Sequence, residues 1–435
     1  MTVITRFAPS PTGKLHVGNI RTALHNWLWA RRNGGRFLLR LDDTDIERST
    51  EAFAEAIHAD LDWLGMRPDG HVRQSDRFAL YESRFALLRA AGRVYPCYET
   101  AQELDLKRKI LVGRGLPPIY DRAALDLAEP PAGIAPHWRF KLDHAVPIAW
   151  DDLIRGPQTL DPRLMSDPVV RRADGSWLYM LPSVIDDIDM GITHVVRGED
   201  HVTNTGLQLQ MFAALGAPPP VFAHAALLTG SEGKLSKRLG ALGCDSFREE
   251  GIEPIALKAL LARIGTSDPV EAFADMAPLV ESFDFARFGR APARFDPGEL
   301  AALNARILHQ TPFAAVAARL PAGIDEAGWN AIRPNIARLS DVADWWVVVE
   351  GPVVSTADDA AYLGEAAAVA AAIDWSTDPW HALTAMLKER TGRKGKALFL
   401  PLRQALTGRD HGPDMAALLP LIGRERALER LRSGA

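Results

Sequence analysis

The segment 9–19, PSPTGKLHVGN, contains residue types that could bind the phosphates of a nucleotide. It follows a run of β-forming residues and precedes an amphipathic helical pattern, so it should lie at the N-terminus of a helix. Free backbone N–H groups and the helix dipole attract anions at such a position. His16 could donate a hydrogen bond to a phosphoryl group, and Gly18 would let a nucleotide approach the backbone closely. The segment predicts a nucleotide site, although a simple helix-capping turn would use the same residues.

A second segment, 229–240, combines glycines with the cationic run KLSKR, from Lys234 through Ser236 and Lys237 to Arg238. Positive charges on a glycine-rich stretch can clamp phosphates and stabilise the negative charge that develops on a leaving pyrophosphate. An ordinary basic surface loop would look the same. No Walker sequence or GxGxxG sequence competes as the phosphate site. The two segments together indicate ATP chemistry more strongly than either does alone.

The elements that would position these segments alternate between strand and helix. Strands are predicted at 2–8, 36–41, 194–197 and 225–228, and helices from about 18, over about 50–64 and at 203–215. This order is typical of the α/β class, with a Rossmann-like doubly wound parallel sheet. Both candidate segments follow strands, so both should fall at the carboxyl ends of the strands, where such sheets bind ligands.

The chain should divide into several parts, because 435 residues exceed one ordinary core. A proline-punctuated stretch interrupts the strand–helix order and predicts an inserted α+β domain. The later sequence is helical and rich in alanine and leucine. The predicted parts are a Rossmann-like catalytic domain at 1–94 and 186–250, the insertion at 95–185, a helical region at 251–320 and an all-α C-terminal region at 321–435.

Composition favours a globular protein that is not embedded in a membrane. No uninterrupted apolar run is long enough to cross a bilayer, and the start of the chain lacks the pattern of a signal peptide. We therefore expect a cytoplasmic protein. The net charge of −5 argues against a simple basic nucleic-acid coat protein but is compatible with RNA binding through local basic faces. Cys97 and Cys244 alone provide neither a disulfide framework nor a zinc site.

Several stretches in a fixed order carry a family resemblance. They are TRFAPSPTG at 5–13 with HVGN at 16–19, RLDDTD at 40–45, VRGED at 196–200, KLSKR at 234–238 and LRQALTG at 402–408. With them the sequence resembles the class I aminoacyl-tRNA synthetases, and more narrowly the bacterial glutamyl-tRNA synthetases, over nearly the whole chain. The resemblance implies a glutamate–tRNA ligase that uses ATP with Mg²⁺ to activate L-glutamate and transfers it to the 3′ end of tRNA-Glu. It also implies that the insertion binds the acceptor end, that 251–320 contacts the tRNA stem and that 321–435 binds the anticodon.

The resemblance further implies roles for individual residues. Catalysis is expected to rest on His16, Lys234 and Lys237. ATP is expected to contact His16, Gly18, Asn19, Asp200, Leu228, Lys234, Ser236 and Lys237. The glutamate pocket is expected to contain Arg6, Ala8, Ser10, Asp42, Tyr179, Ser183 and Arg197. Arg197 suits glutamate because a guanidinium holds a carboxylate through two parallel hydrogen bonds and is left unmatched by the amide of glutamine.

Structural roles are open for several of these residues. Arg6 and Arg197 could form internal salt bridges, Tyr179 could pack in the core, and Asp42 could cap the helix that follows it. Asp42 also departs from the family, which usually has a glutamate there, and Ser183 stands where the family often has a larger polar residue. Either change could alter the amino-acid preference.

The resemblance also bears on metal and partners. Some family members bind zinc in the insertion through several cysteines, but only Cys97 remains of that pattern here, so no zinc is expected. Discriminating members carry an arginine that inspects the last anticodon base, and Asn335 stands in that region, which leaves charging of tRNA-Gln open. Trp345 and Trp346 could stack on anticodon bases or pack in a helical core. We expect a monomer whose activation step needs bound tRNA.

Three other functions compete with this one. An enzyme that glutamylates a modified base in tRNA-Asp would lack the anticodon-binding part, and a glutaminyl-tRNA synthetase would have a β-rich one. The helical sequence at 321–435 disagrees with both. A non-catalytic RNA-binding module would have no need of both phosphate-handling segments.

Overall fold

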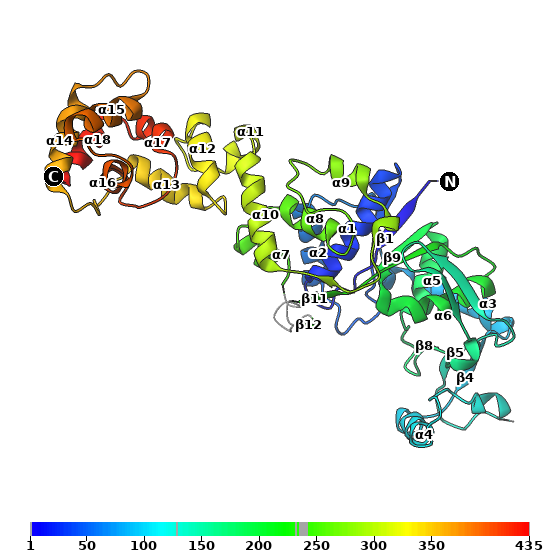
Figure 1. The fold of residues 1–435 in the computed structure, drawn as a ribbon. Helices are drawn as coiled ribbons and strands as arrows, with labels where there is room; N and C mark the ends of the chain where they lie inside the picture. Colours follow the sequence, from blue (N-terminus) through cyan, green and yellow to red (C-terminus); the bar gives the residue numbers. More distant parts are fainter. Residues whose placement is uncertain (1, 128, 231–232, 235–241, 435) are drawn as a thin grey trace. The chain divides into compact units, whose positions relative to one another are not determined.

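The computed structural model describes residues 2–434 except 128, 231–232 and 235–241 (Figure 1). The chain forms two compact units. The first contains Met1–Phe247 with Leu257–Asp296, and the second contains Arg248–Ala256 with Pro297–Ala435.

The first unit is built on a sheet of seven described strands in the order β3-β2-β1-β9-β10-β6-β7. Neighbours from β3 to β6 run parallel, and β7 is antiparallel to β6. The strands are β1 (Ile4–Phe7), β2 (Arg36–Leu41), β3 (His71–Arg73), β6 (Ile148–Asp152), β7 (Gly156–Leu160), β9 (His194–Gly198) and β10 (Val221–Ala225). The predicted α/β class is confirmed. Because β1, β9 and β10 are parallel neighbours, their carboxyl ends meet at one edge of the sheet.

Helices over 17–32, 51–63 and 202–214 lie close to their predicted positions, whereas those over 78–90, 101–113 and 180–189 were not predicted individually. The helices of this unit are α1 (Val17–Arg32), α2 (Glu51–Trp63), α3 (Phe78–Ala90), α4 (Ala101–Gly113), α5 (Met180–Asp189), α6 (Val202–Ala214) and α9 (Ala277–Ser282). Helices α7 (Cys244–Glu249) and α8 (Pro254–Arg263) contain residues of both units. Helix α1 packs on β1, β2 and β9 through fully buried apolar residues at helical spacing, Ile20, Ala23, Leu24 and Leu28. This packing fixes the N-terminus of α1 beside the carboxyl edge of the sheet.

The end of α1 shows why glycine follows it. Gly34 has a positive φ of 59°, which other residues adopt only with strain. A Cβ on Gly35 would lie 2.1 Å from the carbonyl oxygen of Val3, so only glycine lets the chain enter β2 this close to its neighbour.

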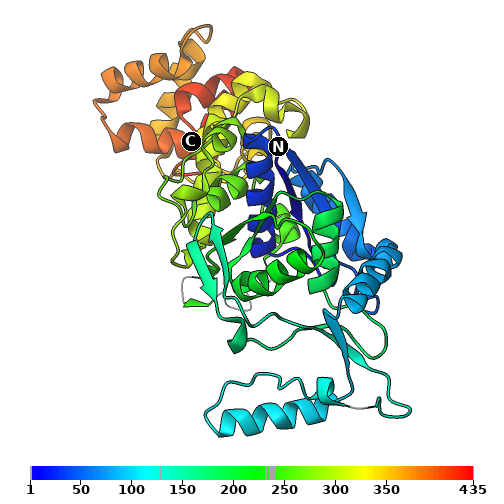
Figure 2. The same ribbon diagram turned by 90° about the vertical axis from the view of Figure 1, so that its right-hand side faces the viewer.

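The predicted insertion at 95–185 does not form a wholly separate body. Strands β4 (Val94–Cys97), β5 (His137–Phe140) and β8 (Val169–Arg171) make a small antiparallel sheet, as an inserted α+β domain would. Strands β6 and β7 come from the same stretch of sequence, yet they extend the main sheet beyond β10. Helix α4 lies away from the main sheet in both views and has no buried residue (Figure 1 and Figure 2). The stretch between prolines therefore supplies both an outlying part and the far edge of the catalytic sheet.

A short three-stranded sheet follows β10. It pairs β11 (Leu228–Gly230) with β12 (Gly233–Lys234) and with β13 (Ala293–Arg294). The expectation that the chain is helical throughout after residue 251 is therefore wrong at β13. Two residues are too short a strand to leave a pattern in sequence.

The second unit is helical. Its helices are α10 (Pro297–Gln310), α11 (Phe313–Val316), α12 (Glu326–Ile332), α13 (Asp341–Glu350), α14 (Ala360–Ala372), α15 (Pro379–Thr391), α16 (Lys396–Thr407), α17 (Met415–Ile422) and α18 (Arg424–Ser433). Helices α17 and α18 are separated at Gly423, whose φ is +79°. Among the described residues, no helix combines the length and the apolar character needed to span a bilayer.

Candidate active site

His16 is the N-cap residue of α1. Its Nδ1 accepts hydrogen bonds from the backbone N–H groups of Gly18 (3.1 Å) and Asn19 (3.4 Å), and the Asn19 side chain accepts one from the His16 N–H (3.3 Å). A neutral imidazole that accepts at Nδ1 carries its proton on Nε2. Desolvation lowers the pKa of His16, which favours this neutral form. The ring therefore has one N–H left to donate.

The first four N–H groups of α1 all have partners. Val17 donates to the carbonyl of Leu242 (2.9 Å), Gly18 and Asn19 donate to the His16 ring, and Ile20 donates to the His16 carbonyl (3.0 Å). The expectation of a phosphate site made from free backbone N–H groups is therefore wrong for this structure. The helix-capping alternative is confirmed, and phosphate binding at this end must come from side chains, with Nε2 of His16 among them.

The chain that follows the second candidate segment returns to His16. Gly243, which closely follows the second segment, forms an antiparallel bridge with His16, next to the bond between Val17 and Leu242. Within the segment, β11 and β12 pair Thr229 with Lys234. Ser236, Lys237 and Arg238 lie outside the described residues, as does the side chain of Lys234. The chain directly after the segment, at Leu242 and Gly243, is thus held at the start of α1.

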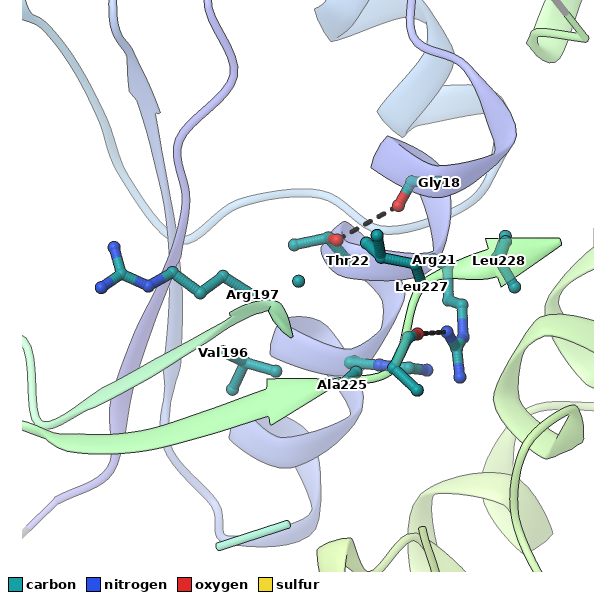
Figure 3. Close-up of a pocket in the computed structure, with 11 residues that line it drawn as sticks. Gly18, Arg21, Thr22, Val196, Arg197, Ala225, Leu227 and Leu228 are labelled. Carbon is teal, nitrogen blue, oxygen red and sulfur yellow. Dashed lines mark hydrogen bonds between the residues drawn. The ribbon is translucent and has the colours of Figure 1, made fainter. Parts of the chain in front are cut away.

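A pocket lies between the N-terminal turn of α1 and the ends of β9 and β10 (Figure 3). Gly18, Thr22, Val196, Gly198 and Leu228 are among its lining residues. Figure 3 shows the Arg197 guanidinium pointing away from Gly18 and Leu228. Arg197 therefore lines one side of this pocket, and its charged group is turned away from Gly18 and Leu228. Two of the residues predicted to bind ATP, Gly18 and Leu228, are brought together here.

Arg197 is a buried cation whose described hydrogen-bond partners are neutral. Its Nε donates to Nε2 of His224 (3.3 Å), and its Nη2 donates to Oγ1 of Thr205 (2.5 Å) and Oε1 of Gln208 (2.8 Å). Only 8% of the residue is exposed. Burial, and next the nearby charge of Arg6, lower its pKa to about 9. A carboxylate ligand would relieve this unfavourable charge.

Arg6 lies near Arg197 but has a carboxylate partner of its own. Its Nε and Nη2 donate to the two oxygens of Asp187 (3.1 and 3.4 Å), and Nη1 of Arg40 donates to the same carboxylate (2.7 Å). Burial alone would raise the pKa of Asp187, but Arg6 and Arg40 hold it below its usual value. Arg6 therefore forms an internal salt bridge, as the sequence left open. Arg197 forms none with the described residues.

Asp42 and Ser183 both bind Arg40. Arg40 donates to Asp42 through Nε (2.6 Å) and Nη2 (3.2 Å), and its Nη2 also reaches the hydroxyl of Ser183 (3.1 Å). Burial raises the pKa of Asp42, and the charge of Arg40 opposes the rise. The side chain of Asp42 is 10% exposed, while Ser183 is buried. Asp42 can therefore still reach a ligand, whereas Ser183 acts on the site through Arg40.

Tyr179 is partly exposed and lies near the charged residues Arg197, Asp200 and Asp42. Its hydroxyl accepts a hydrogen bond from the Asn204 side chain. Burial raises its pKa, the charge of Arg197 opposes this rise, and Asp200 and Asp42 add to it. The charges of three other predicted site residues therefore act on the Tyr179 hydroxyl. At 36% exposure Tyr179 is not a core residue, which removes the alternative of core packing.

The remaining predicted residues lie on turns beside these. Ala8 is half-buried, and Ser10 and Asp200 are exposed. The carbonyl of Pro9 accepts a hydrogen bond from the N–H of Asp42 (2.9 Å), which joins the turn after β1 to the turn after β2. Arg6, Ala8, Ser10 and Asp42 thus belong to one small region.

Sequence reasoning missed several residues of this region. Arg40 and Asp187 hold Arg6 and Asp42, and His224 with Asp152 lies behind Arg197. A signal was present for two of them. Arg40 interrupts the apolar run RFLLRL, and His224 stands in the strand VFAHA. A charged or polar residue at a buried strand position needs a partner, which marks it for attention.

The insertion holds a group of possible metal ligands that the cysteine pattern did not reveal. The ligand atoms of Cys97, Glu99 and His137 all lie within 4.8 Å of one another. Burial, however, raises the pKa of the Cys97 thiol to about 11. Glu99 also accepts hydrogen bonds from Tyr120 (3.0 Å) and Lys107 (3.2 Å). The Glu99 carboxylate is thus already paired, which makes it a poorer zinc ligand than a free carboxylate.

Residues expected at the anticodon belong to the second unit. Trp345 is 7% exposed, and a Cβ on Gly412 would lie 2.0 Å from its ring, so it is a core residue. Trp346 is half-buried and packs on the same core. Neither is free to stack on a base. Asn335 is exposed at the end of the short helix Arg333–Asn335 and is accessible to RNA.

Two family models match the chain. Residues 2–302, more than half of the chain, match the catalytic domain of the class I tRNA synthetases (E and Q), and residues 324–435 match an anticodon binding domain. The structure superposes on a crystal structure of a glutamate tRNA ligase from Elizabethkingia meningosepticum in complex with its amino acid, with a TM-score of 0.84, 27% identity, and coverage of 99% of this chain and 98% of that one.

Curated relatives extend over the whole chain. A glutamate–tRNA ligase 1 of Rhizorhabdus wittichii is 74% identical, with 100% of both chains covered. A glutamate–tRNA ligase 1 of Zymomonas mobilis is 64% identical, with 99% of both covered. With the parallel sheet and the helical second unit, these matches show that the chain belongs to the class I tRNA synthetases of the E and Q group.

Proposed function

We propose that this chain is a glutamate–tRNA ligase, which activates L-glutamate with magnesium-bound ATP and transfers it to the 3′ end of tRNA-Glu. The observation that carries the proposal is Arg197, a buried guanidinium without a described carboxylate partner, beside a pocket at the N-terminus of α1. A neutral amino acid would leave that charge unmatched.

The first step joins glutamate to the nucleotide. The α-carboxylate of glutamate attacks the α-phosphorus of ATP, the bond to the bridging oxygen breaks, and pyrophosphate leaves. The protein supplies no nucleophile, so its contribution is position and charge. Nε2 of His16 is the donor best supported by the helix cap, and we assign Lys234 and Lys237 to the leaving pyrophosphate. In the second step a terminal hydroxyl of the tRNA attacks the carbonyl carbon of the adenylate, and AMP leaves.

The glutamate pocket follows from the charges described above. We assign the side-chain carboxylate to Arg197, with Arg6 adding positive potential and Tyr179 closing the rim. Asp42 is assigned to the α-ammonium group, because its side chain, at 10%, is the most exposed of the described carboxylates paired with Arg40. The turn residues Ala8 and Ser10 complete the lining.

The nucleotide lies on the other side of Arg197. We assign the base and ribose to the pocket lined by Gly18 and Leu228, and we assign Asn19, Asp200 and Ser236 to further contacts with ATP. A Cβ on Gly18 would lie 3.1 Å from the His16 ring, so a side chain there would disturb the cap as well as the pocket.

The helical second unit supports tRNA as the acceptor. We assign residues 321–435 to the anticodon, 95–185 to the acceptor end and 251–320 to the stem. The rival function, glutamylation of a modified base in tRNA-Asp, has no use for an anticodon domain, and a domain of that kind matches residues 324–435. We further propose a cytoplasmic monomer, and exposed Asn335 leaves open whether tRNA-Gln is charged in addition.

ATP–pyrophosphate exchange tests the activation step. We expect exchange that depends on L-glutamate, is not supported by L-glutamine and requires added tRNA. Exchange with another amino acid, or none with glutamate in the presence of tRNA, would overturn the proposal. Charging of purified tRNA-Glu, tRNA-Gln and tRNA-Asp then identifies the acceptor.

A further inference from the structure

His224 and Arg197 are paired neighbours on adjacent parallel strands. Their register is direct, His224 of β10 opposite Arg197 of β9, so both side chains project from the same face of the sheet. Both are buried, His224 completely. His224 is therefore the residue best placed to set the position of the Arg197 guanidinium.

Asp152 determines which ring nitrogen of His224 carries the proton, and therefore which one can accept a hydrogen bond. Oδ1 of Asp152 accepts from the backbone N–H groups of Ile154 (3.0 Å), Arg155 (2.9 Å) and His224 (3.1 Å), and its Oδ2 lies 2.5 Å from Nδ1 of His224. A carboxylate that accepts at Oδ2 makes Nδ1 the protonated nitrogen, so Nε2 is an acceptor. Burial holds the pKa of His224 below its usual value, although the bond to Asp152 opposes this.

The acceptor at Nε2 organises the groups around Arg197. It lies 2.8 Å from Oγ1 of Thr205 and 3.3 Å from Nε of Arg197. The single lone pair of Nε2 is shared by these two donors, and the Thr205 hydroxyl also lies 3.3 Å from the carbonyl oxygen of His201, to which it can donate instead. In either case Oγ1 of Thr205 accepts from Nη2 of Arg197 (2.5 Å), and Oε1 of Gln208 accepts the second Nη2 hydrogen (2.8 Å). Nε and Nη2 are then both used, and Nη1 makes no hydrogen bond with the part of the chain that the structure describes.

We propose that Asp152 and His224 are positioning residues that, together with Thr205, orient Arg197 so that its Nη1 edge is presented to the side-chain carboxylate of the amino acid. This proposal rests on the proposed function for the identity of that amino acid. Neither Asp152 nor His224 touches the reacting atoms, and their effect is on amino-acid binding rather than on the phosphates.

Asp152→Asn is the variant that tests this proposal most directly. Three backbone N–H groups occupy Oδ1, so the amide oxygen must take that position and the amide NH₂ must face Nδ1 of His224. The imidazole proton then moves to Nε2, where it opposes the N–H of Arg197. Asp151→Asn, on the same strand but exposed, is the matched control.

The steady-state constants of the full-length enzyme with tRNA separate positioning from a general loss of structure. We expect Asp152→Asn to raise the KM for glutamate at least about tenfold, with the KM for ATP and the melting temperature close to those of the control. A glutamate KM within about twofold of wild type, or equal rises in both KM values, would overturn the proposal. A wild-type enzyme without glutamate-dependent exchange would instead refute the proposed function.

Two further pairs keep the test decisive if Asp152→Asn does not fold. His224→Gln can keep an acceptor near Nε2, and His224→Asn can keep only the donor to Asp152, so the first should retain the lower glutamate KM. Thr205→Val should raise the glutamate KM, whereas Thr205→Ser, which keeps the hydroxyl, should keep it close to the wild-type value. Equal behaviour within both pairs contradicts the proposal. Nitrogen NMR of labelled histidine gives an independent readout, with the proton on Nδ1 in wild type and on Nε2 in Asp152→Asn.

Discussion

Arg6 and Arg197 are like charges close to one another, and only Arg6 has a described carboxylate partner. Asp187 accepts hydrogen bonds from Nε and Nη2 of Arg6 at 3.1 and 3.4 Å. The guanidinium of Arg197 instead donates to the neutral acceptors His224, Thr205 and Gln208. An arrangement in which one of two buried guanidiniums is left without an anion is unfavourable in the empty protein. It becomes favourable when a carboxylate arrives, which is the electrostatic basis of the proposed selectivity for glutamate.

Replacing Arg197 with glutamine should remove that selectivity. A buried charged hydrogen-bond pair is worth several kcal/mol to binding, so we expect Arg197→Gln to raise the glutamate KM on the order of 100-fold. The KM for ATP should change little. Exchange kinetics with varied glutamate and varied ATP measure both constants. Arg67→Gln, at a side chain 81% exposed, is the control for loss of a positive charge. An unchanged glutamate KM in Arg197→Gln would remove the residue from the pocket.

His16 should have two separable roles, one as a helix cap and one as a phosphate donor. Asparagine is a good N-cap residue and alanine is not, so His16→Ala should lose about 1 kcal/mol of stability that His16→Asn retains. Both variants lack Nε2–H, and both should lose activity by about 100-fold or more in pyrophosphate exchange. Denaturant unfolding and exchange, measured on the same preparations, distinguish the roles. An active His16→Asn enzyme would show that the cap alone is needed.

The cap should also depend on pH. The pKa of His16 is lowered from 6.5 by desolvation, so the folded state favours the neutral ring. The stability that the ring contributes is therefore complete above pH 6.5 and is lost as the pH falls through its lowered pKa, when Nδ1 becomes protonated and can no longer accept. Unfolding experiments at several pH values should show wild type losing stability relative to His16→Asn on the acid side. Parallel pH profiles would contradict this reading.

Lys237→Ala tests the second phosphate segment. We expect pyrophosphate exchange to fall by more than about tenfold, because a charge that stabilises the leaving group acts mainly in the transition state. Lys109→Ala provides a control at an exposed lysine in α4. Exchange that stays within that factor of wild type would remove Lys237 from the mechanism.

Zinc should be dispensable for this chain. Because Glu99 is already paired to Lys107 and Tyr120, the insertion should hold its shape without metal. We expect the purified protein to contain far less than one zinc per chain, and charging to survive treatment with a strong chelator. Stoichiometric zinc, or charging that is lost on chelation and restored by zinc, would show that Cys97, Glu99 and His137 bind the metal.

Periodicity and glycine placement were enough to predict the parallel sheet and α1. The switch from alternating to helical spacing near residue 18 and the two glycines that end α1 leave clear marks in the sequence. The placement of β6 in the main sheet left none, since its pairing with β10 depends on residues some 70 positions away, as in the register of Asp152 with Phe222. Long-range pairing of this kind is not encoded in a local pattern.

The site was predicted unevenly for the same reason. Arg6, Asp42, Tyr179 and Arg197 could be selected by motif, but the reason that one arginine is neutralised and the other is not lies in Asp187, which comes from α5. The capping role of His16 was recognised as an alternative, yet the count of free N–H groups at α1 required the partner of Val17, the carbonyl of Leu242. The role of a residue that acts through contacts distant in sequence can be recognised only in the folded structure.

A crystal structure of the full chain with a non-hydrolysable glutamyl-adenylate analogue would test the central claim most directly. We predict that the side-chain carboxylate accepts a hydrogen bond from Nη1 of Arg197 and that the phosphate mimic lies about 3 Å from Nε2 of His16. A ligand whose carboxylate faces solvent, or whose phosphate mimic binds away from the start of α1, would contradict the account.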